Sequence, residues 1–214
     1  FKNKTYKINS FKLTDPKWAT EPYEGRFMIR NVKKEEITEE RFFPKGPGPR
    51  IAILAPMVTI LLIRHGIAED TPGADSERSL TTEGWEKSQA AMKGLVNRGY
   101  RPSRGVCSPC RRAAQTLSCL QEAARGGFPV DSWDGLKPGG APAKAEAWLL
   151  GEMAGMEPSG VLALVSHEPF LSTFIHHLTG RTVEVKKTSC TVLRWDGEGF
   201  RFSGHLKAAE LREG

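Results

Sequence analysis

Two short runs of aliphatic residues restrict the possible folds of this chain more than any other feature of its sequence. Residues 58–63 and 161–165 are almost unbroken series of aliphatic side chains. Such runs are typical of strands that lie inside a parallel sheet and are buried on both faces. A segment with helical signals follows each run. The sequence therefore predicts an α/β domain, a three-layer sandwich with a mainly parallel central sheet flanked by helices.

Capping residues locate the first helix of this pattern. Thr81 is a suitable N-cap, and Gly99 is a suitable stop for a helix that reaches about Arg98. Weaker signals predict further elements: a helix over residues 111–125, a helix with Pro169 in its first turn, and closing strands over residues 182–195 and 199–205.

Composition separates the first quarter of the chain from the rest. The whole chain has 31 Lys and Arg and 25 Asp and Glu, of which residues 1–56 contain 12 and 7. Residues 57–214 are thus close to neutral, with 19 basic and 18 acidic side chains. A stretch rich in Pro and Gly, residues 44–49, closes the basic segment like a linker. We expect residues 1–56 to be an N-terminal extension or a fused segment, and residues 57–214 to form one domain.

Composition also argues against several classes of protein. No apolar run approaches the roughly 20 residues that a membrane-spanning helix needs, and the first residues lack the apolar core of a secretory signal. Cys107, Cys110, Cys119 and Cys190 make no convincing disulfide framework. We therefore expect a cytoplasmic protein with no membrane partner. Nucleic acid is not expected as a partner either, because the excess positive charge lies outside the main domain.

Both predicted central strands end in a histidine, His65 and His167. The carboxyl ends of strands form the ligand crevice of an open α/β sheet, so these two side chains should converge although they are far apart in the sequence. Arg64, Arg78 and Arg112 lie beside the same predicted edge. Phosphoryl transfer needs fixed positive charge around the phosphoryl oxygens, which guanidinium groups supply through paired hydrogen bonds. The pattern indicates a site for a phosphorylated substrate.

Four short motifs contain these residues. They are Leu62-Ile-Arg64-His65-Gly66-Ile-Ala68, Asp75-x-x-Arg78-x-Leu-Thr-x-x-Gly84, Ser108-Pro-x-x-Arg112-Ala-x-Gln-Thr116 and Val165-Ser-His167-x-Pro169. Together, in this order, they resemble the motifs of the histidine phosphatase superfamily, which includes phosphoglycerate mutases, and in detail those of its SixA-type phosphohistidine phosphatases. The resemblance extends over residues 58–202 and implies a phosphoglycerate-mutase-like fold.

The resemblance also implies roles for single residues. His65 matches the nucleophile that becomes transiently phosphorylated, while Arg64, Arg112 and His167 match the pocket that binds the phosphoryl oxygens. Arg78 matches an arginine that joins this pocket in the SixA-type branch. His65 and the three pocket residues are therefore the predicted catalytic residues.

Elementary chemistry sets the protonation states that such a site requires. His65 must be neutral at the attacking nitrogen, and an acceptor on its other nitrogen, such as the backbone at Gly66, should fix the tautomer. Gly66 and Arg78 are the expected substrate-binding residues beside the nucleophile. His167 should be protonated once phosphate is bound, because anionic oxygens raise its pKa.

No metal and no cofactor are expected. The sequence has no His-x-x-His motif, and the single Cys107-x-x-Cys110 pair has no second pair to complete a zinc site. Many members of the superfamily use a glutamate as general acid, and no glutamate here clearly matches it, which leaves Asp134 and Glu168 as possible proton donors. A strong acid matters most for an alkoxide leaving group, so its absence favours a phosphoramidate such as phosphohistidine.

These observations favour a phosphatase that removes phosphate from phosphohistidine on a protein, through a phosphohistidine enzyme intermediate. The main alternative is a phosphatase of a small phosphorylated metabolite on the same fold, and a mutase is a lesser one. The chain lacks the long insertions that shape a metabolite pocket in mutases, and residues 139–142 predict a short open loop. In a non-enzyme alternative, residues 1–56 form a basic and aromatic binding module and the phosphatase fold is only its scaffold.

Overall fold

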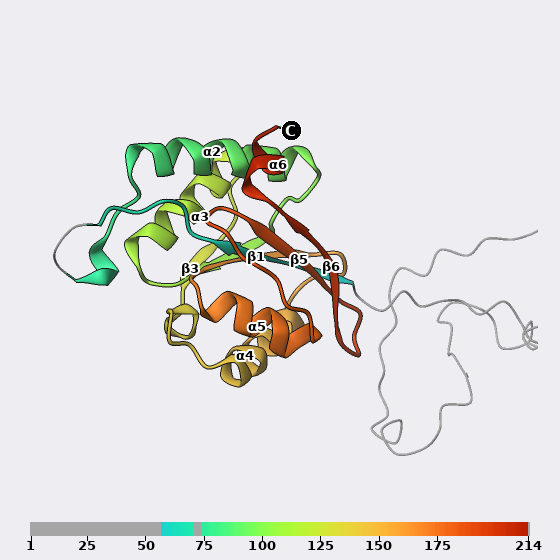
Figure 1. Ribbon diagram of the computed structural model, residues 1–214. Helices are drawn as coiled ribbons and strands as arrows, with labels where there is room; N and C mark the ends of the chain where they lie inside the picture. The colour runs from blue at the N-terminus through green and yellow to red at the C-terminus, as the bar shows by residue number, and fades with distance from the viewer. Residues whose placement is uncertain (1–56, 71–73, 214) are drawn as a thin grey trace, which may run out of the picture. The chain divides into compact units, whose positions relative to one another are not determined.

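A six-stranded sheet forms the centre of the structure, a computed structural model that describes residues 57–70 and 74–213 (Figure 1). In chain order, its strands are β1 (Val58–Arg64), β2 (Arg104–Cys107), β3 (Val130–Ser132), β4 (Val161–Ser166), β5 (Cys190–Trp195) and β6 (Phe200–Leu206). The strand order is β3-β2-β4-β1-β5-β6; the first four strands are mutually parallel, β5 pairs antiparallel with β1, and β6 pairs antiparallel with β5. The predicted mainly parallel sheet is confirmed. The predicted extension, residues 1–56, lies outside the described residues.

Helices cover both faces of the sheet (Figure 1). They are α2 (Thr82–Asn97), α3 (Arg111–Ala123), α4 (Pro142–Ala154), α5 (Phe170–Thr179) and the short α6 (Ala208–Arg212). α2, α3 and α6 pack on one face around Met92 and Leu120, and α4 and α5 pack on the other around Leu149 and Phe174. Two hydrophobic cores with the sheet between them make the predicted three-layer sandwich.

The two aliphatic runs lie side by side at the centre of the sheet, as β1 and β4. Their parallel register pairs Ile63 with Val165 and Arg64 with Ser166. The strands therefore end at the same level, and the backbone N–H of His65 donates to the carbonyl of Ser166 at 3.1 Å. This register brings the residues that follow the two strands to one place.

The first predicted helix is correct in detail. The Thr81 hydroxyl accepts a hydrogen bond from the N–H of Gly84 at 2.9 Å, which caps α2 as expected. The helix ends at Asn97, and Gly99 adopts a left-handed φ of 88°. Helix α3 ends at Ala123, earlier than predicted, and the next residues turn away through a left-handed backbone.

Two other predictions need correction. The expected strand over residues 182–195 begins only at Cys190, because residues 182–189 form an irregular segment with a turn in which Ser189 N–H donates to the Lys186 carbonyl. Pro169 is the N-cap of α5 and not part of its first turn. The short loop at residues 139–142 is as short as predicted: Gly139 and Ala141 are exposed, Gly140 packs against Phe170, and Pro142 begins α4.

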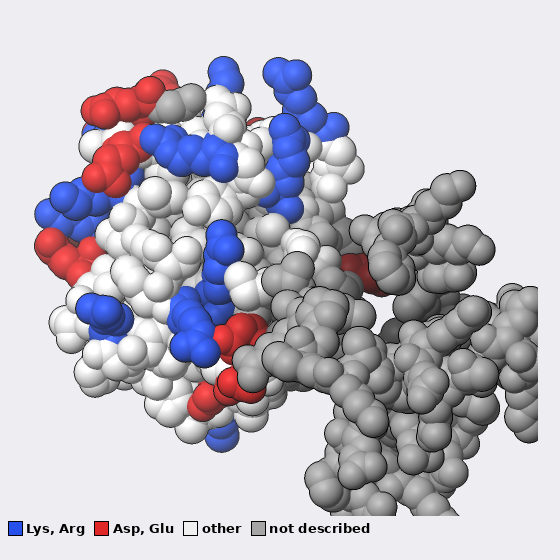
Figure 2. Space-filling model, turned by 90° about the vertical axis from the view of Figure 1, so that its right-hand side faces the viewer, with Lys and Arg blue, Asp and Glu red and all other residues white. Residues whose placement is uncertain are grey.

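Charged side chains are dispersed over the surface of this domain. On the part of the face visible in Figure 2, Lys and Arg side chains stand among uncharged residues, with Asp and Glu near them. Within the described ranges, no helix combines the length and the apolar character needed to cross a membrane.

Candidate active site

His65 follows β1 directly and is only 8% exposed. Its Nδ1 atom lies 2.7 Å from the carbonyl oxygen of Gly66. A carbonyl oxygen can only accept, so Nδ1 carries the proton and Nε2 carries the lone pair. This is the acceptor that the sequence predicts, and it leaves the lone pair on Nε2, the atom expected to act as nucleophile.

Arg112 confirms the tautomer from the opposite side. It lies in the first turn of α3, is 4% exposed, and its Nε–H donates to Nε2 of His65 at 3.3 Å. Its other two nitrogens bind Asp75: Nη2 lies 2.7 Å from Oδ2, and Nη1 donates to the backbone carbonyl. The guanidinium group is therefore held in place with one N–H directed at the predicted nucleophile.

His167 follows β4 and completes the pair. The ring centroids of His65 and His167 are 4.8 Å apart. Nε2 of His167 lies 2.8 Å from the hydroxyl of Ser108, which in turn accepts from the N–H of Cys110 at 3.2 Å. Nδ1 is buried and has no hydrogen-bond partner among the described residues, so it is available to a substrate oxygen.

Arg64 is fixed by the irregular segment that precedes β5. Its Nη1 donates to the Val185 carbonyl at 2.8 Å, and its own carbonyl accepts from the N–H of Thr188 at 3.0 Å. Thr188 is buried and has a φ of 65°, a strained conformation for a β-branched residue. Within the described part of the chain, the buried Nε of Arg64 has no partner. A phosphoryl oxygen that reached this buried N–H would supply the acceptor that it lacks.

The protonation states of both histidines follow from this setting. Burial lowers the pKa of His65 to about 3; the charge that His167 carries when protonated and the charges of Arg112 and Arg64 add to the shift. Burial also lowers the pKa of His167 to about 4, helped by the charges of Arg112 and Arg64. Both rings are therefore neutral at pH 7. Anionic phosphoryl oxygens would raise the pKa of His167 and favour its protonation, as expected.

Arg78 lies at the end of the loop that follows His65 and makes no hydrogen bond to either histidine. Its Nη1 lies 3.2 Å from Oδ1 of Asp75, its Nη2 lies 3.4 Å from Asp70, and its Nε donates to the Glu69 carbonyl. The Asp75 carboxylate thus joins Arg78 to Arg112. Sequence reasoning did not include Asp75 among the site residues, although it begins the motif that contains Arg78.

Gly66 occupies a position that has no room for a side chain. A Cβ atom there would lie 2.3 Å from Oγ of Ser88 and 3.1 Å from the Gly84 carbonyl. The N–H of Gly66 donates to Oγ1 of Thr116 at 3.1 Å. Glycine is therefore needed for the close approach of α2 to the nucleophile loop, and a direct contact with substrate stays a prediction.

The two possible proton donors are engaged elsewhere. Oδ1 of Asp134 lies 3.0 Å from Nζ of Lys137 at an exposed position. The Glu168 carboxylate accepts from the N–H and the hydroxyl of Ser172, at 3.0 and 2.7 Å, and so caps the first turn of α5. Neither carboxylate makes a hydrogen bond to a catalytic histidine. A role for either residue as proton donor stays a prediction.

No metal-binding cluster of three or more His, Cys, Asp or Glu residues occurs in residues 57–70 and 74–213. Cys107 and Cys110 are buried free thiols. Burial, followed by the neighbouring Cys110, raises the pKa of Cys107 to about 11, which disfavours the thiolate form that zinc requires.

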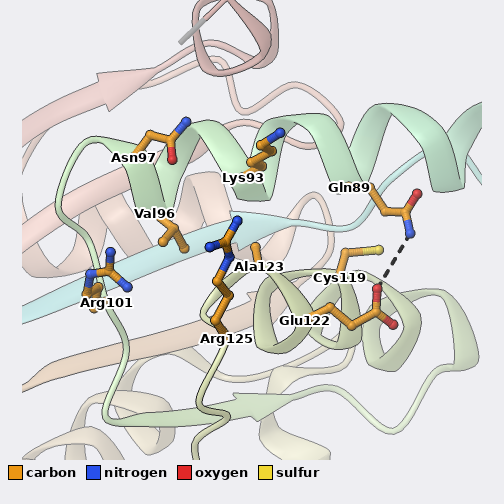
Figure 3. Close-up of a pocket in the computed structure, with 9 residues that line it drawn as sticks. All are labelled: Gln89, Lys93, Val96, Asn97, Arg101, Cys119, Glu122, Ala123 and Arg125. Carbon is orange, nitrogen blue, oxygen red and sulfur yellow. Dashed lines mark hydrogen bonds between the residues drawn. The ribbon is translucent and has the colours of Figure 1, made fainter.

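A hollow of about 420 Å³ lies away from this site, between the C-terminal halves of α2 and α3 (Figure 3). Lys93, Arg101 and Arg125 line it.

Comparisons with known proteins agree with this geometry. Residues 60–138 match the histidine phosphatase superfamily (branch 1). An uncharacterized protein of Picosynechococcus sp. is 32% identical over 141 residues, which cover 63% of this chain and 84% of that protein. The chain belongs to the histidine phosphatase superfamily, whose activities are those of phosphatases and mutases.

Solved structures show the same fold. The protein histidine phosphatase SixA, in complex with tungstate, is 22% identical and has a TM-score of 0.67, covering 72% of this chain and 99% of its own. A phosphoglycerate mutase from Bacillus anthracis is 14% identical and has a TM-score of 0.61, covering 74% and 96%. The phosphoglycerate-mutase-like fold is confirmed. At these sequence identities, the structural similarity shows the fold and does not indicate which substrate this chain binds.

Proposed function

We propose that this protein is a phosphatase that works through phosphorylated His65 and removes phosphate from phosphohistidine on a protein. The observation that carries the proposal is the state of His65. Its ring is neutral, its Nδ1 proton is committed to the Gly66 carbonyl, and its Nε2 lone pair faces Arg112 in a buried site. When a phosphoryl oxygen takes over the Arg112 hydrogen bond, this lone pair is released for attack on phosphorus.

In the first step, Nε2 of His65 forms a bond to phosphorus while the bond from phosphorus to the leaving group breaks. Arg64, Arg112 and His167 supply hydrogen bonds and positive charge to the phosphoryl oxygens, which carry the charge of the transition state. Because Nδ1 keeps its proton, the phosphorylated ring is cationic. The carbonyl of Gly66 stabilises that charge.

In the second step, water attacks phosphorus and the His65 ring leaves as neutral imidazole. Both protons of the water stay with the phosphate, which is released as dihydrogen phosphate, and the ring returns to its starting tautomer. The cycle therefore needs no general acid or base for the ring of His65 itself.

The leaving group of the substrate decides whether a proton donor is needed. A phosphohistidine that carries a proton on its other ring nitrogen also leaves as neutral imidazole, whereas an alkyl ester leaves as an alkoxide that must be protonated. Asp134 is paired with Lys137 and Glu168 caps α5. These pairs support a substrate that brings its own proton.

A small phosphorylated metabolite is the second candidate substrate, supported by the fold that the chain shares with a phosphoglycerate mutase. A comparison of turnover on phosphohistidine, p-nitrophenyl phosphate and 3-phosphoglycerate with one preparation separates the candidates. We expect kcat/KM to be highest for phosphohistidine. A higher value for 3-phosphoglycerate would assign the protein to the metabolite phosphatases.

A further inference from the structure

One carboxylate connects the two arginines that flank the candidate site. Oδ2 of Asp75 lies 2.7 Å from Nη2 of Arg112, and Oδ1 lies 3.2 Å from Nη1 of Arg78. We infer that Asp75 is a positioning residue that aims Arg112 at Nε2 of His65 and couples Arg78 to the phosphoryl site. This inference rests on the proposed function, because it concerns the same site.

The contacts of Arg112 explain why it needs such a partner. Its side chain is almost fully buried, and Asp75 binds both of its Nη groups, one through the carboxylate and one through the backbone carbonyl. Only Nε–H remains directed at His65. A buried guanidinium group without these acceptors would be costly to hold in place and would lose its fixed orientation.

Asp75 is not the missing general acid. The hydrogen bond from Arg112 holds the pKa of Asp75 below its ordinary value, and Arg78 adds to the shift. The carboxylate is therefore ionised at neutral pH and has no proton to donate. Its position is suited to orienting Arg112 and not to protonating a leaving group.

The alternative role for Asp75 is that of a competitor, whose negative charge occupies Arg112 until substrate displaces it. The geometry favours positioning, because Asp75 binds only the Nη atoms of Arg112. The Nε–H that faces His65 makes no hydrogen bond to Asp75. The two roles predict opposite effects when the charge is removed. Loss of a positioning group weakens the binding of a phosphate mimic, whereas loss of a competitor strengthens it.

The test compares Asp75→Asn with Glu77→Gln in the full chain. Glu77 lies in the same short helix, η3 (Asp75–Glu77), and pairs with Arg111 on the surface, so its variant is a matched control. We expect Asp75→Asn to lower kcat/KM for phosphoramidate and to weaken vanadate binding by about 10²-fold, as for a misaligned catalytic group. Glu77→Gln should leave both unchanged. Thermal unfolding of each variant shows whether the fold is kept.

A double-mutant cycle separates positioning from a general structural role. If Asp75 acts through Arg112, Asp75→Asn should have less than about 3-fold further effect on vanadate binding in an Arg112→Ala background. An equal loss in both backgrounds, an unchanged vanadate affinity, or tighter vanadate binding in the single variant would overturn the inference. Vanadate binding is measured without turnover, so the result stands even if phosphohistidine proves not to be the substrate.

Discussion

Arg112 and His65 face each other across 3.3 Å, with the Nε–H group of the arginine directed at the Nε2 lone pair of the histidine. The contact joins the first turn of α3 to the end of β1. In the proposed mechanism, the attacking nitrogen is therefore free of a proton before substrate arrives, and a phosphoryl group that enters the site meets a donor beside this nitrogen.

Replacement of His65 by alanine should lower kcat for phosphoramidate by at least about 10³-fold, because the covalent route is lost. Rapid quenching of the unaltered enzyme with labelled substrate should give acid-labile, base-stable label on His65. His177→Ala, at an exposed position paired with Glu146, is the matched control and should keep full activity. Covalent label on the His65→Ala protein would contradict the assignment.

Activity should persist in excess EDTA, because the proposed steps use only side chains. Vanadate should inhibit by binding among Arg64, Arg112 and His167, as a mimic of the transition state. His167→Ala should weaken this inhibition, whereas Arg101→Ala, in the hollow of Figure 3, should not. Steady-state inhibition constants provide the measurement. Loss of activity with the chelator and its recovery with zinc or magnesium would show that the mechanism is wrong.

The argument about the leaving group predicts an order of substrates. The enzyme should hydrolyse phosphoramidate well, p-nitrophenyl phosphate slowly and simple alkyl phosphates hardly at all. Asp134→Asn should cost less than about 10-fold on phosphoramidate, because a proton donor contributes about 10²–10⁴-fold only where the leaving group needs one. Lys137→Gln removes the partner of Asp134 and serves as a control for the ion pair. A loss of about 10³-fold on every substrate in Asp134→Asn, with unchanged stability, would identify Asp134 as the general acid.

Stability should depend on pH through the two buried histidines. Their pKa values are about 3 for His65 and about 4 for His167 in the folded protein, against 6.5 for the ordinary side chain. Between pH 6.5 and about 4 the unfolded chain therefore binds more protons, so the free energy of unfolding falls as the pH falls. Each histidine contributes up to about 1.4 kcal/mol per pH unit.

Urea unfolding at a series of pH values in this window measures the slope. His167→Gln should reduce the slope of unfolding free energy against pH by up to the contribution of one histidine. The same slope in both proteins would show that His167 does not resist protonation in the folded state.

The convergence of His65 and His167 was predictable because a simple rule governs it. Aliphatic runs mark buried parallel strands, and ligands bind where such strands end. The capping of α2 by Thr81 was equally visible, since it depends on residues close in the sequence. The helix α4 was missed, although Pro142 stands at its first turn, because Gly139 and Gly140 favoured a loop.

Other features depend on contacts that no local pattern encodes. Residues 182–189 have Val and Thr side chains that favour a strand, but they form a turn whose carbonyl and N–H groups hold Arg64. The pairing of Asp75 with Arg112 likewise joins a loop and a helix that are far apart in the sequence. Sequence showed that these residues belong to motifs, and only the fold shows what they touch.

The hydrogen bond between the backbone of His65 and that of Ser166 ties the proposed catalytic pair, His65 and His167, to neighbouring strands of the sheet. The described chain between the two histidines forms three strands of the sheet, β2, β3 and β4, together with the helices α2, α3 and α4 and the loops that join them. Between η4 (Asp134–Leu136) and α4, exposed loop positions such as Gly139 can therefore change without moving that pair, because no other group approaches them. In such an architecture, changes confined to the loops around the site can alter which substrate binds, while the residues proposed to carry the reaction stay the same.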